Sequence, residues 1–521
     1  MSNPFAEVQL NAGTLEEASP APRVMEERAY AIALLGDFSG RGSRGIAGEA
    51  LRTPEAILVD RDDLEDVLAR VAPALQVHLP GADAPMELDF RELDDFHPDR
   101  LFARLPLFRE LRDLRARLLD SATFAAAAAE LRHAGGPASK GVQPDAGMVG
   151  NDQDGHGASN GSAPEADPGL LDGILDRIVE AAEPSPEAGG PVDPLTPAGF
   201  RSYVRHILAP HLVADADPRQ AELVDHVDAA TGEQMRILLH DPGFQALEGL
   251  WRGVDRLVRG VPTGPLLRLY LVDVSRRDLA ATLASPEPGS TPLGRLLATG
   301  PEAGNRGPWG LLVGGYTFGP ADDDLGVLGA MAREGARVGA PWIAAAQPAL
   351  LGCPSPGALT EPEGWSEPTP DWSALRRSPE ARWLGLALPR LLGRLPYGEE
   401  ADACELFRFE EFDGPEDHAH YLWGNPALGC ALLLAQAFAS DGWAMRPGSV
   451  REVTGLPLHL VRHESETAAL PCAEVWLTER AADRILDSGL MPFASRRDRD
   501  AAQLVRFQSI ADPVTGLAAP R

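Results

Sequence analysis

The chain has 521 residues, of which 44% are hydrophobic, and this predicts two or three domains with apolar cores. A formal net charge of −30 argues against a nucleic-acid backbone as a partner. We find no uncharged apolar run of about 18 residues and no basic leader before an apolar block. We therefore expect neither a membrane-spanning helix nor an export signal. Four widely spaced cysteines without a CxxC pair predict neither a zinc site nor a disulfide framework, and they fit a reducing cytoplasm.

The N-terminal region alternates short strands and helices after a polar arm at residues 1–28. Runs rich in apolar residues predict strands, and apolar residues at three- and four-residue steps predict helices. The last of these helices is long and carries an apolar stripe from Leu101 to Leu118. The predicted strands are 30–38, 57–60, 75–79 and 86–90, and the predicted helices are 62–72 and 101–118.

A glycine-rich loop, Gly40–Gly45, follows the first strand and formally matches the dinucleotide fingerprint GxGxxG. Asp60 lies at about the position where this fingerprint has an acidic residue that binds the ribose of the nucleotide. The fingerprint needs a helix that begins inside the loop and holds the pyrophosphate at its N-terminus. Residues 46–56 contain Gly48 and Pro54 and leave hardly any room for such a helix. We favour a surface loop, with a nucleotide-dependent oxidoreductase as a remote alternative.

A low-complexity stretch, residues 134–168, contains almost no large apolar residue and predicts a flexible linker. As a random coil it would span roughly 30 Å, enough for two domains to dock on each other or on neighbouring copies. An amphipathic helix is predicted next, at residues 169–182, and a Pro- and Gly-rich stretch at 184–197 isolates it. Its apolar stripe consists of Leu170, Leu171, Ile174, Leu175 and Ile178.

The C-terminal region is organised around one predicted helix, residues 240–259, which follows two further helices at 200–212 and 220–239. Asp241 can cap its first turn, and Pro242 stands where a missing N–H costs nothing. Glu248 and Arg252 are one turn apart and can pair. The apolar run 266–274 predicts a strand covered on both faces. Farther on we expect a strand, an acidic helix and a second strand within 309–352, a strand at 474–477 and a helix at 479–488.

Three polar clusters resemble metal or acid–base sites but have simpler interpretations. Asp94, Asp95 and His97 precede a helix, where acidic residues and a proline serve as caps. Asp322–Asp324 are expected to complement a helix dipole in the same way. His418 and His420 lack a third ligand in a recognisable pattern. We also find no nucleophile elbow, HExxH motif, Walker loop or paired catalytic carboxylates, so we predict no enzyme, cofactor or metal.

Two resemblances cover about nine-tenths of the chain. The sequence FQALEGLWRG (244–253), with blocks at 309–352, 380–398, 407–412 and 420–438, resembles the large subunit of the contractile sheath in type VI secretion systems. LLGDFSG (34–40), followed by blocks at 59–75 and 88–118, is similar to the small sheath subunit. The positions that carry the family motifs are Gly36, Asp37, Ser39, Gly40, Asp94, Asp95, Phe96, His97, Pro98, Phe244, Glu248, Trp251, Arg252, Gly253, Pro389, Arg390, Pro396, Tyr397, Gly398, Trp423, Gly424 and Asn425.

The resemblance implies an α/β fold of mixed sheets flanked by helices, as in phage tail sheaths. It implies a small-subunit domain at 1–133, the linker at 134–168 and a large-subunit region at 169–521. The family usually makes the two subunits as separate chains. The large-subunit part looks shortened, notably between Leu283 and Pro308 and at the C-terminus.

The function implied is that of a cytoplasmic sheath subunit. It would polymerise with its own copies around an inner-tube protein on a baseplate and contract to drive secretion. In the family a ring-shaped ATPase grips a helix at the start of the large subunit, and Leu170–Ile178 is the candidate here. Neither nucleic acid nor direct membrane insertion is expected. The alternative is a scaffold or cap of the same ancestry that no longer polymerises.

Overall fold

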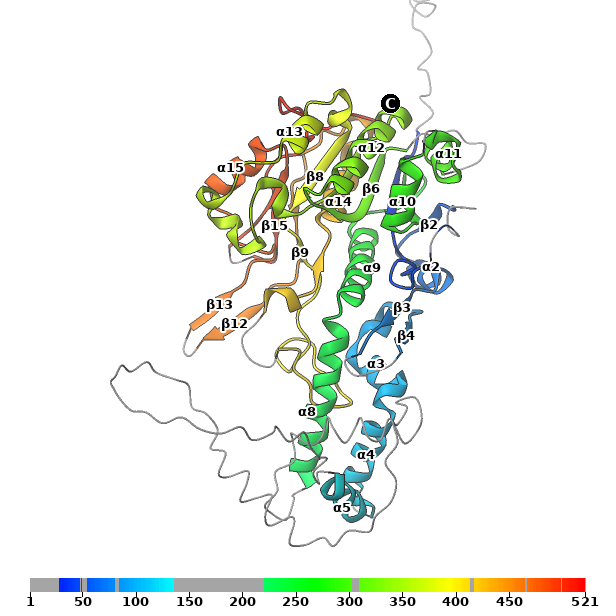
Figure 1. Cartoon of the computed structure of the whole chain (residues 1–521), viewed down its shortest axis with the longest axis vertical. Coiled ribbons are helices and arrows are strands. Elements are labelled where there is room, and N and C mark those ends of the chain that lie inside the picture. Colours follow the sequence, from blue (N-terminus) through cyan, green and yellow to red (C-terminus); the bar gives the residue numbers. More distant parts are fainter. Residues whose placement is uncertain are drawn as a thin grey trace, which may run out of the picture.

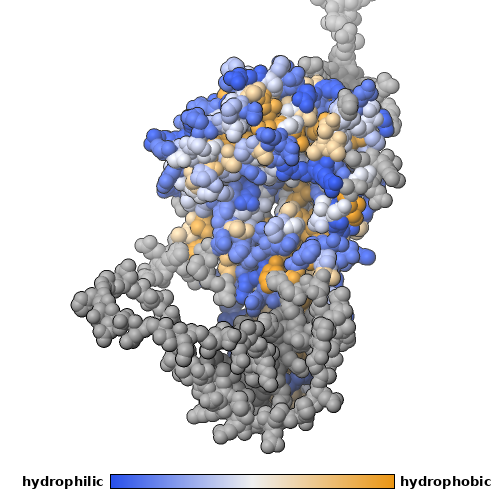
Figure 2. All heavy atoms as spheres, viewed as in Figure 1, coloured by the Kyte–Doolittle hydropathy of each residue, from blue (hydrophilic) through white to orange (hydrophobic). Residues whose placement is uncertain are grey.

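The computed structural model describes residues 28–46, 48, 54–79, 84–120, 122–134, 220–285, 287–301, 309–412, 417–463, 466–497 and 499–520. Figure 1 shows an α/β body above a narrower part in which α8 (Gln220–Leu239) runs beside α4 (Arg109–Leu119). On the face drawn in Figure 2, the described surface is mainly hydrophilic, and hydrophobic residues form scattered patches.

The body is built on a nine-stranded sheet with the order β11-β15-β14-β8-β7-β6-β1-β5-β2. The six strands from β14 to β5 are parallel to their neighbours, and antiparallel strands complete both edges. This arrangement confirms the predicted class of a mixed α/β sheet flanked by helices. The strands are β1 Tyr30–Gly36, β2 Ile57–Val59, β5 Leu267–Asp273, β6 Leu311–Phe318, β7 Trp342–Ala346, β8 Leu384–Leu388, β11 Glu452–Val453, β14 Met491–Ser495 and β15 Ala502–Leu504.

Strand β1 lies inside the sheet, between two strands of the C-terminal region. It pairs in parallel with β5 along its whole length, from Tyr30 opposite Leu267 to Gly36 opposite Asp273. On its other side it pairs with β6. Every residue of β1 is buried, as expected for an unbroken apolar strand in a parallel sheet. The N-terminal and C-terminal regions therefore share one sheet.

Helices cover both faces of this sheet. On one face, α9 (Pro242–Gly260) and α14 (Pro426–Asp441) pack over a core that includes Ile32 and Leu34 of β1. On the other, α10 (Arg276–Leu283), α11 (Pro292–Thr299) and α12 (Asp322–Val338) cover Ala31, Ala33 and Leu35. Successive β1 side chains thus enter opposite cores because a strand alternates its faces.

Smaller elements complete the fold. Within the described ranges, three two-stranded antiparallel sheets lie outside the main sheet, and further helices pack around it. The strand pairs are β3 Ala74–Val77 with β4 Met86–Asp89, β9 Leu391–Leu392 with β10 Trp423–Gly424, and β12 Leu460–His463 with β13 Glu466–Ala469. The remaining α-helices in the described part of the chain are α2 Leu64–Val71, α3 Pro98–Arg104, α5 Phe124–Ala134, α13 Pro370–Arg376 and α15 Glu479–Asp487.

Two predicted elements are wrong. The helix predicted from Leu101 to Leu118 is two helices, α3 and α4, because Pro106 cannot continue α3 and holds Leu105 in an extended conformation. The strand predicted at 474–477 is absent, and only Ala473 forms an isolated bridge, with Leu391. Helix α5 was not predicted, because its run of alanines carries no amphipathic pattern.

One described stretch, Pro426–Ala444, is long and apolar enough to cross a membrane by length and composition, which the sequence reasoning did not anticipate. In the structure 61% of this window is buried inside the protein. Its helix α14 packs against α9 and against β6, β7 and β8 of the sheet. A core helix passes the same composition test, so this stretch is weak evidence for a membrane span.

Candidate functional site

Helix α9 carries most of the residues of the candidate site. Asp241 caps it, because Oδ1 accepts from the Phe244 amide at 2.9 Å, and Pro242 occupies the first helical position. Apolar residues at three- and four-residue steps predict one inner face of this helix, and all of them are buried: Phe244, Leu247, Leu250, Trp251, Val254, Leu257 and Val258. Among them, Trp251 donates from Nε1 to the Phe38 carbonyl, just beyond β1, at 3.0 Å. These contacts confirm the predicted helix and hold it against the N-terminal region.

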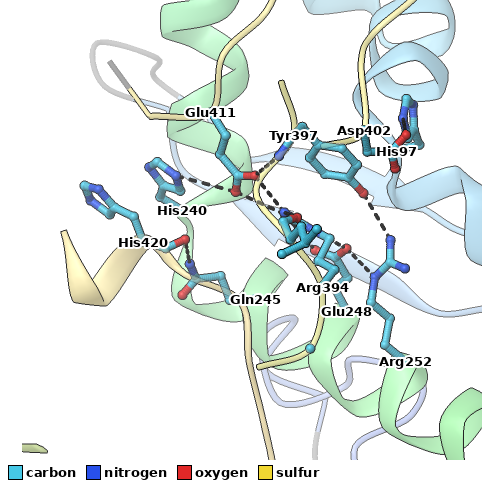
Figure 3. A network of polar contacts seen from close by, with 12 residues as sticks. His97, His240, Gln245, Glu248, Arg252, Arg394, Tyr397, Asp402, Glu411 and His420 are labelled. Atoms are coloured by element: carbon cyan, nitrogen blue, oxygen red, sulfur yellow. Dashed lines mark hydrogen bonds and ion pairs between the residues drawn. The ribbon is translucent and has the colours of Figure 1, made fainter. Parts of the chain in front are cut away.

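A buried cluster of charges joins α9 to the segment that follows β9 (Figure 3). We call it the charge cluster: Glu248, Arg252, Arg394, Tyr397 and Glu411. Glu248 Oε1 accepts from Arg252 Nε at 2.7 Å and from Arg394 Nε at 2.9 Å. Arg394 Nη1 also donates to Glu411 Oε2 at 2.6 Å. The Arg394 guanidinium thus lies between two carboxylates, and the predicted Glu248–Arg252 pair is confirmed.

Tyr397 contacts three other members of the charge cluster: Glu411, Arg252 and Arg394. Its amide donates to Glu411 Oε2 at 2.8 Å, and its hydroxyl accepts from Arg252 Nη2 at 3.0 Å. The guanidinium carbon of Arg394 lies 4.0 Å from the centroid of the Tyr397 ring, a cation–π distance. Two arginines therefore balance two carboxylates, and each carboxylate has several donors.

Burial and charge pairing oppose each other in this cluster. Burial alone would raise the pKa of Glu248, but Arg394 and Arg252 outweigh it and hold that pKa below its usual value. Burial likewise disfavours the charged form of Arg394, but Glu248 and Glu411 raise its pKa well above the ordinary value. Both groups stay ionised, so removing one partner would leave an uncompensated buried charge.

The N-terminal region reaches the charge cluster through the motif before α3. The rings of His97 and Tyr397 meet edge to face with centroids 4.9 Å apart, and His97 Nε2 lies 3.7 Å from Asp402 Oδ1. Asp99 accepts from the Glu405 amide at 2.8 Å. The charge cluster therefore lies where the two regions meet.

The break between α8 and α9 lies beside the same cluster. The His240 ring stacks on His420 with centroids 3.9 Å apart, and His240 Nε2 lies 3.8 Å from Glu411 Oε1. Gln245 donates from Nε2 to the His420 carbonyl at 3.2 Å. Burial, with His420 and Arg394, lowers the pKa of His240 to about 4, so this ring is neutral near neutral pH.

A second ion pair, between Arg390 and Glu474, lies beside β10. Arg390 Nε lies 2.9 Å from Glu474 Oε1, and the Arg390 amide donates to the other oxygen at 2.8 Å. His418 Nε2 lies 3.3 Å from the same carboxylate, and its ring stacks on Trp423. Burial would raise the pKa of Glu474, but His418 and Arg390 outweigh it and hold that pKa at about 2.

The glycine-rich loop and the residue before it donate to carboxylates outside the loop. Asp37 accepts from the amides of Arg41 and Gly42 at 2.8 and 2.7 Å, and the Ser39 amide donates to Asp273 Oδ1 at 3.0 Å. Gly40 has φ +68°, and a Cβ there would meet the Ala74 carbonyl at 2.3 Å. Amides that would cradle a phosphate are bonded to carboxylates, which does not favour the nucleotide alternative.

The motif Asp94–Pro98 performs the capping expected of it. Asp95 accepts from the Arg91 amide at 2.6 Å, and His97 Nδ1 accepts from the Asp99 amide at 3.2 Å, directly before Pro98 opens α3. Asp94 accepts from the His97 amide through its carbonyl. Phe96 stacks on Phe90 at 4.1 Å and meets Phe244 of α9.

The remaining motif positions have packing or capping contacts. A Cβ on Gly253 would meet Leu428 at 2.3 Å, and one on Gly398 would meet Glu410 at 2.1 Å. Asn425 caps α14, accepting from the Ala427 amide at 2.9 Å, and its amide group donates to the Tyr316 carbonyl. Gly36 lies against Leu250, Gly424 pairs in β10 and Pro389 follows a cis peptide bond. Pro396 is buried directly before Tyr397.

The acidic and histidine clusters do not converge on a metal. Asp324 accepts from the Gly319 amide at 2.7 Å and pairs with Arg276, while His418 and His420 stack on different rings. Across the described ranges, no group of three or more His, Cys, Asp or Glu side chains could hold a metal ion. The candidate ATPase-binding stripe, Leu170 to Ile178, lies outside the described residues.

Sequence reasoning missed Arg394, Glu411 and His240 as members of the site. Glu248 and Arg252 are four residues apart, so their pairing is a local signal. Arg394 is 146 residues from Glu248, and no periodicity connects them. The only available hint was that Arg394 and Glu411 fall inside the sequence blocks 380–398 and 407–412.

Fold and site together define a mixed α/β protein in which buried charges connect two regions of one chain. Residues 221–511 match the family of EvpB/VC_A0108, tail sheath N-terminal domain, and residues 20–134 match the family "Type VI secretion system, VipA, VC_A0107 or Hcp2". The chain therefore belongs to the type VI secretion tail sheath family, with regions similar to both the small and the large subunit.

A relative, the type VI secretion system sheath protein TssC1 of Pseudomonas aeruginosa, is 32% identical over 314 residues. The match covers 57% of this chain and 63% of the relative, so less than two thirds of that protein's length is represented.

Proposed function

We propose that this chain is the structural subunit of a type VI secretion-like contractile sheath, combining both sheath subunits in one polypeptide. Copies would polymerise around an inner-tube protein and contract to drive protein secretion. Contacts between copies that do not close into a ring build a helical tube. The tube would contract by switching between two packings of its subunits. The protein acts without catalysis.

One observation supports this most strongly: β1 of the small-subunit-like region fills the middle of a sheet whose other main strands come from the large-subunit-like region. A charge cluster and the contacts of His97 and Asp99 tie the same two regions together. A rigid unit of fixed one-to-one composition is what a mechanical lattice requires. The limits 1–133, 134–168 and 169–521 are our proposal for the small-subunit domain, linker and large-subunit region.

The partners we propose follow from that role. They are other copies of the chain, an inner-tube protein, baseplate components and a ring-shaped ATPase that binds at Leu170–Ile178. The cytoplasm is the compartment in which such a sheath would assemble.

Negative-stain microscopy of purified full-length protein, with and without the inner-tube protein, tests the proposal. Tubes or rings are expected. Protein that stays monodisperse and monomeric in light scattering under both conditions would contradict it and favour the scaffold or cap alternative.

A further inference from the structure

Five of the parallel strands lie in the order β5-β1-β6-β7-β8, but the chain passes through them as β1, β5, β6, β7 and β8. The chain therefore leaves β1 toward one side of the sheet and leaves β6 toward the other. The connection after β1 returns through α9 on one face, and the connection after β6 returns through α12 on the opposite face. In open α/β sheets, ligands bind in the crevice at the carboxyl ends of two such strands.

A cavity of about 710 Å³ lies at this crevice. Asp37, directly after β1, and Tyr316, near the carboxyl end of β6, both line it, and the starts of α9, α10 and α12 form other parts of its wall. Small-molecule sites in proteins usually measure ~300–1,000 Å³ and are mostly apolar. The large apolar side chains of this wall are Ile46, Leu75, Leu247, Leu250 and Val327.

Several polar groups of the wall already have partners inside the protein. Asp37 accepts from two loop amides, and the Tyr316 hydroxyl donates to the Val274 carbonyl at 2.6 Å. Arg276 of α10 pairs with Asp324 of α12. These groups therefore do not require a ligand.

Two charged side chains beside the Arg276–Asp324 pair are not committed in this way. Arg277 and Asp323 both line the cavity, and among the described residues neither side chain has a hydrogen bond or an ion pair. They have opposite charges and follow or precede the two members of a pair that joins the helix starts. A ligand that carries both a carboxylate and an ammonium group can satisfy both charges at once.

The charges of the whole wall favour such a ligand over a phosphate. Three aspartates and two arginines line the cavity, so a doubly negative group would meet more acids than bases. We propose that this cavity binds an α-amino acid with a large apolar side chain. Its carboxylate would bind Arg277, its ammonium group would bind Asp323, and its side chain would pack on the apolar wall. This inference goes beyond the proposed function and does not depend on it.

The ligand would contact both regions of the chain, because Leu75 belongs to the N-terminal region and Leu247 to the C-terminal region. Calorimetric titration of the full-length protein with L-tryptophan tests the proposal. Two analogues are the matched controls: tryptamine lacks the carboxylate, and indole-3-propionate lacks the ammonium group. L-tryptophan should bind saturably at one molecule per chain, and each analogue should bind about tenfold more weakly or worse, since each loses a charge-assisted contact. Three equal affinities, or no saturable binding of L-tryptophan and L-phenylalanine up to their solubility limits, would overturn the proposal.

Variants of the two charged residues assign the contacts. Arg277→Met should weaken L-tryptophan binding about tenfold and leave tryptamine binding unchanged, because tryptamine has no carboxylate to lose. Asp323→Asn should do the same for L-tryptophan and indole-3-propionate. The matched control is Arg333→Met, an exposed arginine of α12 outside the cavity wall. Equal affinities of Arg277→Met, Asp323→Asn and Arg333→Met for L-tryptophan would contradict the assigned contacts and with them the proposal.

Filling the cavity locates the site. Ala246 of α9 is exposed and lines the cavity, so Ala246→Trp should occupy the space and abolish L-tryptophan binding. Ala229→Trp, at an exposed position of α8 outside the wall, should bind like the wild type. Circular dichroism checks that both variants are folded. Undiminished binding in folded Ala246→Trp would place the ligand elsewhere and overturn the proposal; if this variant does not fold, the charge variants decide.

Discussion

Arg394 and Glu248 form an ion pair that connects the segment after β9 to the central helix α9. Their Nε and Oε1 atoms are 2.9 Å apart, and both residues are buried. Because another nitrogen of the same guanidinium donates to Glu411, Arg394 lies between two buried carboxylates. This geometry makes Arg394 the most sensitive position of the site.

Replacing Arg394 by Met should lower the free energy of unfolding by ~3–5 kcal/mol, because it removes the arginine that neutralises Glu411 in the core and one of the two arginines that neutralise Glu248. Urea unfolding followed by circular dichroism measures this. The matched control is Arg408→Met, whose side chain pairs with Glu399 at the surface. An exposed pair contributes roughly 0–1 kcal/mol. Equal midpoints for the two variants would show that the charge cluster is not a stabilising contact.

Trp251→Ala should also be severe. Truncating a buried aromatic side chain typically costs ~3–5 kcal/mol, and here the Phe38 carbonyl also loses its donor. Trp251→Phe keeps a ring but removes the donor, so a smaller loss of about 1–3 kcal/mol is expected. Both are read from urea melts. Wild-type stability in Trp251→Ala would mean that α9 does not hold the N-terminal region as described.

The protein should lose stability as pH falls from about 6.5 toward 4, in part through His240. Its folded pKa is about 4, below the value of the unfolded chain. Between these values the unfolded state binds a proton that the folded state does not, so stability rises with pH and is complete above about 6.5.

Removing this group tests the pH dependence directly. His240→Gln should flatten the slope of unfolding free energy against pH between 4 and 6.5. His78→Gln, at an exposed position, is the control and should leave the slope unchanged. An identical slope in His240→Gln and wild type would assign the acid sensitivity to other groups.

The stripe Leu170, Leu171, Ile174, Leu175 and Ile178 has the pattern of a helix that binds in a groove. A peptide of residues 165–184 should therefore capture the N-terminal domain of the cognate ATPase in a pull-down. The same peptide with Ile174→Asp and Leu175→Asp should not, because two charges interrupt the stripe. Capture that is absent, or equal with both peptides, would leave an ordinary structural helix.

Sequence reasoning was strongest where the physical cause is local. The cap of α9 at Asp241, its apolar face and the Glu248–Arg252 pair all depend on residues within one or two turns. The break at Pro106 was equally local and could have been read, since proline excludes the preceding residue from a helix.

Pairing between distant residues was beyond such reasoning. The apolar run of β1 predicts a buried strand, but nothing in it says that Tyr30 lies opposite Leu267 rather than in a sheet of its own. The same holds for Arg394, whose two carboxylates come from different segments. Only the resemblance to the sheath family hinted that these distant blocks belong together.

The N-terminal and C-terminal regions should form one folding unit through β1, and thermal melting of fragments tests this most directly. Residues 1–133 alone should be insoluble or helix-poor and show no cooperative transition, because β1 lacks both its neighbours. Adding residues 169–521 in trans should restore a soluble complex that melts cooperatively. Independent, cooperative melting of residues 1–133 with full helix content would contradict the account.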